Sequence, residues 1–85
     1  MNSEEARKIG FNDHIDVGGI AYHVQTEVMG RGELKARTLV YESGVIQHAE
    51  SQPLGGEGRS LEELRSEVDA QHRRVVSLVR AGLQS

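Results

Sequence analysis

The feature that most constrains the fold of this chain is a pair of adjacent glycines, Gly18 and Gly19, set between two short runs of alternating polar and apolar residues. Alternation with a period of two is typical of a β-strand with one buried face. Paired glycines accept the positive φ angles of the tight turns that join antiparallel strands. Residues 13–27 are therefore predicted to form a β-hairpin.

The two-residue turn also fixes which side chains of this hairpin meet. With Val17 opposite Ile20, the register places His14 opposite His23. The large apolar side chains then share one face, as expected when turn chemistry and alternation agree. The other face carries His14, Asp16, Ala21, His23, Gln25 and Glu27.

A second hairpin is predicted around Ser43 and Gly44, after a glycine-bearing turn at residues 28–33. Apolar residues fall on both of its faces, and a sheet of this kind usually has something packed on both sides. The expected cross-strand pairs are Glu42 with Val45, Tyr41 with Ile46, Leu39 with His48, and Arg37 with Glu50, the last as an ion pair.

Residues 60–82 carry the signals of an amphipathic helix, preceded by a loop at 52–59. Ser60 followed three residues later by Glu63 is a capping box, and Gly82 stands where helices commonly end. Acidic residues near the start and arginines near the end suit the helix dipole. The apolar stripe at helical spacing is Leu61, Leu64, Val68, Val75, Val76, Val79 and Leu83.

These elements predict one small α+β domain, a four-stranded antiparallel meander with the C-terminal helix packed on one face. We expect residues 1–12 to form a mobile N-terminal tail that is anchored at Phe11 and has room for one helical turn, and the domain to span residues 13–85 with its strands within 13–51. The chain has 85 residues, no cysteine and 4% aromatic residues, so its core is thin. Oligomerisation is the natural remaining source of stability.

The apolar sector of the helix widens near Leu78, beyond what a helix covering a single sheet needs. Together with the two-faced second hairpin, this width indicates a second contact. We therefore expect a homodimer or a protein partner. The predicted interface residues are Val40, Val45, Val75, Val76, Leu78 and Val79.

His14 and His23 raise an alternative function. Directly opposed residues have Cβ atoms about 5 Å apart, close enough for both imidazoles to bind one divalent metal. However, catalytic metal sites normally use three protein ligands and structural sites four. The favoured interpretation is a solvent-exposed strand face, and a small-ligand or metal site around these histidines is the alternative.

His72, in the middle of the helical stripe, is either a hydrogen-bonded core residue or a group whose protonation is coupled to an interface. Ser43 lacks the context of a nucleophile elbow. The glycines before Ser60 lead into acidic residues that would repel a phosphate. No catalytic residue and no cofactor is expected.

The net charge of -3 and the isoelectric point near 5.8 argue against a nucleic-acid partner. Without cysteine, and without an apolar segment long enough for a signal peptide or a membrane span, we expect a cytoplasmic protein with no membrane partner. The sequence thus predicts a small non-enzymatic interaction or regulatory module.

Overall fold

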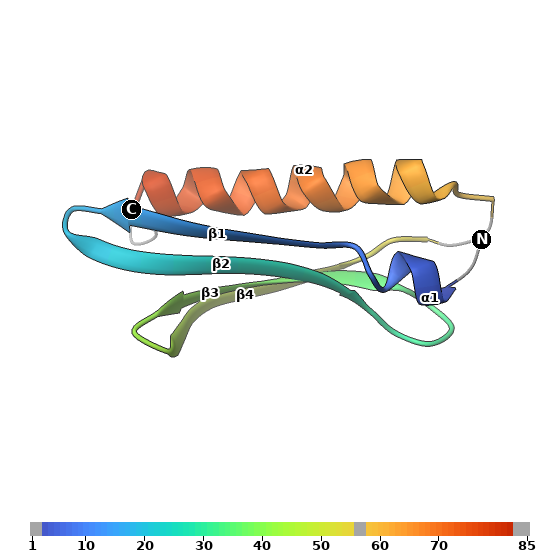
Figure 1. Ribbon diagram of the computed structural model, residues 1–85, viewed down its shortest axis with the longest axis horizontal. Helices are drawn as coiled ribbons and strands as arrows, with labels where there is room; N and C mark the ends of the chain where they lie inside the picture. Colours follow the sequence, from blue (N-terminus) through green and yellow to red (C-terminus); the bar gives the residue numbers. More distant parts are fainter. Residues whose placement is uncertain (1–2, 56–57, 83–85) are drawn as a thin grey trace.

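The computed structural model, which describes residues 3–55 and 58–82, has the expected α+β architecture (Figure 1). One four-stranded antiparallel sheet, in the order β1-β2-β3-β4, is packed on one face against a long C-terminal helix. The face of the sheet that meets this helix is called the helix face, and the opposite one the outer face. The elements are α1 (Ser3–Ala6), β1 (Gly10–Val17), β2 (Ile20–Met29), β3 (Lys35–Glu42), β4 (Val45–Pro53) and α2 (Leu61–Arg80).

The register of the first hairpin is confirmed. Val17 lies opposite Ile20 and His14 opposite His23, and both turn glycines have positive φ angles. Such angles are easily reached only without a Cβ atom. Because side chains alternate along each strand, this register sends the apolar residues toward α2 and both histidines to the outer face.

The second hairpin pairs as predicted only beside its turn, where Tyr41 lies opposite Ile46. Further along, Val40 lies opposite His48, so Gln47 is an extra residue of β4 and forms a β-bulge. Two predicted pairs assumed an uninterrupted register and are wrong, namely Leu39 with His48 and Arg37 with Glu50.

The bulge exchanges the faces of β4 beyond Gln47. Glu50 now lies on the helix face, opposite Thr38, and forms an ion pair with Arg74 of α2. Arg37 lies on the outer face and pairs instead with Glu27 of β2 at 2.6 Å. One inserted residue therefore gives both charged side chains different partners from those expected.

The N-terminal segment differs from the tail expected at residues 1–12. Residues 3–6 form α1, and β1 begins at Gly10, inside the expected tail. Ala6 and Ile9 are buried, because they cover the end of the core that the sheet and α2 leave open. The folded domain therefore begins before residue 13, and residues 1–2 lie outside the described part of the chain.

Helix α2 begins as the capping box predicts. The Glu63 backbone N–H donates to Ser60 Oγ at 3.1 Å, and the Ser60 backbone N–H donates to the Glu63 carboxylate at 2.8 Å. The latter bond holds the pKa of Glu63 below the usual value of a glutamate. At the other end, Ala81 is the C-cap and Gly82 has a φ of 88°, a typical helix stop.

The core contains two apolar clusters that follow one another along α2. The α1 cluster comprises Ala6, Ile9, Val28, Leu34, Ala36, Leu54, Leu64 and Val68. The hairpin cluster comprises Ile15, Val24, Val40, Val75 and Val79. Between them lie four buried polar residues, Thr26, Thr38, Gln71 and His72. Leu83, the last residue of the predicted helical stripe, lies outside the described residues.

Candidate functional site

The six predicted interface residues occupy different environments. Val45 is 60% exposed, Leu78 is 41% exposed, and Val76 is half-buried. The other three are fully used in the core of the single chain, namely Val40, Val75 and Val79. Contact with a second copy through the exposed members stays a prediction.

The exposed large hydrophobic residues of the described chain lie at one end of the molecule, with Ile46 on the outer face of the sheet and Ile20 and Val45 on the helix face. Ile20 flanks the β1–β2 turn, Val45 and Ile46 follow the β3–β4 turn, and Leu78 lies in the last turns of α2. Both turns and the C-terminal part of α2 are at the left of Figure 1. We call these four residues the hairpin end. Their exposed fractions run from 41% to 60%.

The opposite end of the core is closed by additional segments. Ala6 of α1 is completely buried, and Leu34 and Leu54, which lie in the loops beside β3 and β4, are at most 4% exposed. The backbone N–H of Leu54 donates to the carbonyl of Leu34 at 2.9 Å and ties these loops together. Within residues 3–55 and 58–82, no comparable segment covers the hairpin end.

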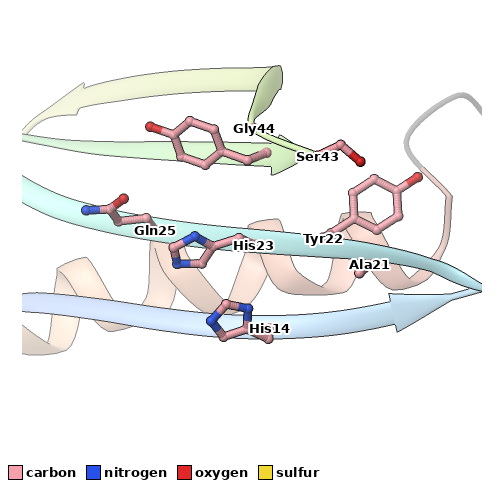
Figure 2. Close-up of a pocket in the computed structure, with 8 residues that line it drawn as sticks. His14, Ala21, Tyr22, His23, Gln25, Ser43 and Gly44 are labelled. Carbon is pink, nitrogen blue, oxygen red and sulfur yellow. The ribbon is translucent and has the colours of Figure 1, made fainter.

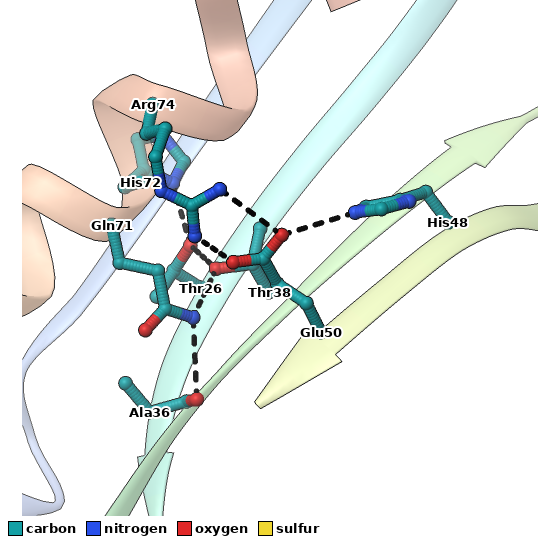
Figure 3. Close-up of polar contacts among 8 residues, drawn as sticks. All are labelled: Thr26, Ala36, Thr38, His48, Glu50, Gln71, His72 and Arg74. Atoms are coloured by element: carbon teal, nitrogen blue, oxygen red, sulfur yellow. Dashed lines mark hydrogen bonds and ion pairs between the residues drawn. The ribbon is translucent and has the colours of Figure 1, made fainter. Parts of the chain in front are cut away.

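A chain of hydrogen bonds links α2 to three strands, and Figure 3 shows its buried part, which joins α2 to β2 and β3. His72 Nδ1 is 2.7 Å from Thr26 Oγ1, which is 2.7 Å from Thr38 Oγ1. Gln71 Nε2 donates to Thr38 Oγ1 at 2.9 Å. At the other end, His72 Nε2 is 2.8 Å from Asp13 Oδ2 on β1. We call these five residues the polar chain.

The direction of the hydrogen bonds in the polar chain follows from the acceptors at the two ends of that chain. Gln71 Nε2 also lies 3.2 Å from the carbonyl oxygen of Ala36, so this atom must be the amide nitrogen. Thr38 Oγ1 accepts from Gln71 but could accept a second bond, so the direction is set at the other end, where the Asp13 carboxylate can only accept and His72 Nε2 donates. Nδ1 then accepts from Thr26, which uses its single hydrogen there and so accepts from Thr38. The oxygen of the Gln71 amide is buried without a partner among the described residues, which costs free energy of folding. The two hydrogen bonds of the amide nitrogen offset this cost.

Thr26 in turn donates to Nδ1 of His72, whose Nε2–H donates to the Asp13 carboxylate. The order carboxylate, imidazole, hydroxyl is that of a catalytic triad. A nucleophile must be reached by its substrate, however, and Thr26 and His72 are only 1% and 2% exposed. In this arrangement the hydrogen bonds hold α2 in place against β1 and β2.

The sequence analysis singled out His72 but missed its partners. Thr26 lies between Val24 and Val28 on the helix face of β2, so the strand alternation itself places a hydroxyl in the core. Buried hydroxyl groups need hydrogen-bond partners. That inward threonine was the available signal for a polar chain.

His14 and His23 lie side by side on the outer face as predicted. Their ring centroids are 4.5 Å apart and their planes differ by only 9°, so the rings are stacked. Lone pairs in parallel ring planes do not converge on one ion, and His23 Nε2 is engaged by Asn12 Oδ1 at 3.0 Å. Within the described part of the chain, no group of three or more metal-binding side chains is found.

An open groove of about 340 Å³ lies over these histidines (Figure 2). Helix α2 packs on the other face of the sheet and leaves this groove uncovered. Apart from Ala21 and Gly44, the side chains around it are polar or aromatic, and none carries a permanent charge. The lining residues are His14, Ala21, Tyr22, His23, Gln25, Tyr41, Ser43 and Gly44.

Comparison with known proteins found no matching family model, no matching curated protein and no matching solved structure. Among the described residues, no helix combines the length and apolar character needed to cross a lipid bilayer. The functional conclusion therefore rests on the geometry of this chain alone.

Proposed function

We propose that this protein is a small non-enzymatic interaction module that acts as a homodimer, and that the hairpin end is the surface through which two copies meet. The observation that carries this proposal is the asymmetry of the core. One end is closed by α1 and two buried leucines, whereas the other exposes four large hydrophobic side chains. Grouped apolar residues of this kind mark interaction sites more often than scattered ones do.

A two-fold contact suits this surface energetically. In a symmetric dimer the same patch is used on both subunits, so every side chain of the hairpin end contributes twice. Fully burying an exposed valine, leucine or isoleucine is worth about 1.5–3 kcal/mol, and a partly exposed one gives correspondingly less. Such a contact also supplies stability that an 85-residue core with few aromatic residues lacks.

Charges around the hairpin end are compatible with self-association. Asp16 and Glu42 lie at the ends of β1 and β3, and Arg80 closes α2 at the same end of the molecule. A two-fold axis allows the acidic strand ends of one copy to face the arginine of the other. Complementary charge of this kind fixes register more than it adds affinity.

The non-enzymatic part of the proposal is supported by the polar chain. Its imidazole and hydroxyl groups are closed to substrate, and only Asp13, with a side chain 55% exposed, lies at the surface. A chain without cysteine has no need of an oxidising compartment, so we propose a cytoplasmic location.

The proposal is tested by recording backbone amide spectra over a dilution series. Dissociation should move or narrow the signals of Ile20, Val45, Ile46 and Leu78, while those of α1 and Leu54 stay constant. A spectrum that does not change with concentration would overturn the homodimer. Changes confined to the α1 end would overturn the choice of surface.

A further inference from the structure

We propose that the groove on the outer face of the sheet binds a small, uncharged planar heterocycle, which adds to an end of the row formed by the rings of His14, His23 and Tyr41. The groove borders the hairpin end, because Tyr41 lies opposite Ile46 and because Ser43 and Gly44 form the β3–β4 turn. A ligand site there goes beyond the proposed dimer. We call His14, His23 and Tyr41 the ring row.

The ring row results from the register of three neighbouring strands. His14 of β1 lies opposite His23 of β2, which lies opposite Tyr41 of β3. The ring centroids are 4.5 Å apart within the histidine pair and 5.9 Å apart between His23 and Tyr41. The planes differ by 9° and 31° respectively, so the two histidine rings are stacked and the Tyr41 ring is tilted against that of His23. A flat ligand can extend such a stack at separations that favour aromatic pairs.

The central ring of the row is held in position before any ligand arrives. His23 Nε2 donates to Asn12 Oδ1 at 3.0 Å, and its ring is flanked by those of His14 and Tyr41. Figure 2 shows both histidines on the same side of the sheet, beneath the open groove. Fixed side chains lose little conformational entropy on binding, and this favours even a small ligand.

Polar groups near the ring row suit the edge of a heterocycle. Gln25 offers an amide with both donor and acceptor atoms, and Ser43 offers a hydroxyl. Figure 2 shows Gln25 beside His23, and Ser43 in the β3–β4 turn above Tyr22. A volume of about 340 Å³ is at the small end of the range for ligand sites, about 300–1,000 Å³. The groove therefore suits one base-sized ring system.

The lining also indicates that the ligand is uncharged. None of the eight residues around the groove is a lysine or an arginine, and the whole chain has a net charge of -3. Phosphate groups are normally held by such cations or by helix N-termini. A nucleoside or a free heterocycle therefore fits this groove better than a nucleotide or a nucleic-acid strand.

The test is a titration with adenosine, followed through the aromatic proton signals of the histidines and tyrosines. Binding should move the signals of the terminal ring that the purine covers, His14 or Tyr41, upfield, because a stacked purine shields it, and leave His48 unchanged. His23→Leu and Tyr41→Leu should each weaken binding about tenfold or more. The matched control is His48→Leu, since His48 lies on the helix face opposite Val40.

Circular dichroism shows which variants are folded. If His23→Leu or Tyr41→Leu does not fold, His14→Leu, at an exposed position, is used in its place. The absence of ring shifts up to the solubility limit of adenosine would overturn the proposal. So would equal weakening in the His48→Leu control, or equal shifts with ribose alone. Tighter binding of adenosine monophosphate than of adenosine would overturn the uncharged ligand class.

Discussion

Nδ1 of His72 lies 2.7 Å from the hydroxyl oxygen of Thr26, which is 46 residues earlier in the chain. This bond joins the middle of α2 to the middle of β2, between the α1 cluster and the hairpin cluster. Apolar packing alone tolerates small shifts of a helix over a sheet, whereas a hydrogen bond with fixed geometry does not. We infer that the polar chain sets the position of α2 along the sheet.

The contribution of Thr26 is tested by Thr26→Val, which keeps the shape of the side chain and removes the hydroxyl. His72 Nδ1 and the Thr38 hydroxyl would then be buried without their partner, at a cost of about 2 kcal/mol in the free energy of unfolding. Urea denaturation measures this loss. Thr26→Ser, which keeps the hydroxyl, should lose less. Equal stability of Thr26→Val and wild type would show that the polar chain does not stabilise the fold.

The hydrogen-bond direction predicts the tautomer of His72. Because Thr26 donates to Nδ1 and Asp13 accepts from Nε2, the ring hydrogen should reside on Nε2. Nitrogen-15 chemical shifts of the imidazole ring distinguish the two tautomers. A hydrogen found on Nδ1 alone would reverse the direction assigned to the polar chain.

Much of the fold could be predicted because local signals agreed with each other. Gly18 and Gly19 favour a tight turn, and the alternation on both sides then leaves one register that gathers the apolar residues. Ser60 and Glu63 likewise mark the start of α2 within a few residues. Each of these signals depends on residues that are close in the sequence.

What could not be predicted depends on contacts between distant segments. The bulge at Gln47 has no glycine or proline to mark it, and it places Glu50 beside Arg74 on α2. The expected tail carries Ala6 and Ile9 into the core, although apolar residues are few in this segment and show no regular spacing. The ring row was partly foreseen through His14 and His23, whereas Tyr41 joins it only once β3 is paired with β2.

The helix cap gives a prediction for Ser60. Ser60→Ala removes the side-chain acceptor of the Glu63 N–H and should lower the free energy of unfolding by about 1 kcal/mol. Thermal denaturation should show a melting temperature several degrees lower. Ser66→Ala, on the exposed face of the same helix, is the control and should leave the melting temperature nearly unchanged.

Glu63 should make stability depend on pH in the acid range. Its folded pKa is lower than its unfolded value because the carboxylate accepts the Ser60 backbone N–H. The stabilisation is therefore fully present above the unfolded pKa and is lost as the pH falls through the folded pKa. Urea midpoints of wild type and Glu63→Gln should converge on acidification. A constant difference between them down to strongly acidic pH would contradict this assignment, and Glu62→Gln serves as the neighbouring control.

Sedimentation equilibrium tests the central claim, association through the hairpin end, most directly. The wild-type protein should sediment as a dimer that dissociates on dilution. Leu78→Glu places a charge in the contact and should give a monomer that keeps its circular dichroism spectrum, since Leu78 is 41% exposed. Ser66→Glu adds the same charge to α2 away from the hairpin end and should leave the dimer intact. A monomeric wild type at high concentration, or a Leu78→Glu variant as dimeric as wild type, would contradict the proposal.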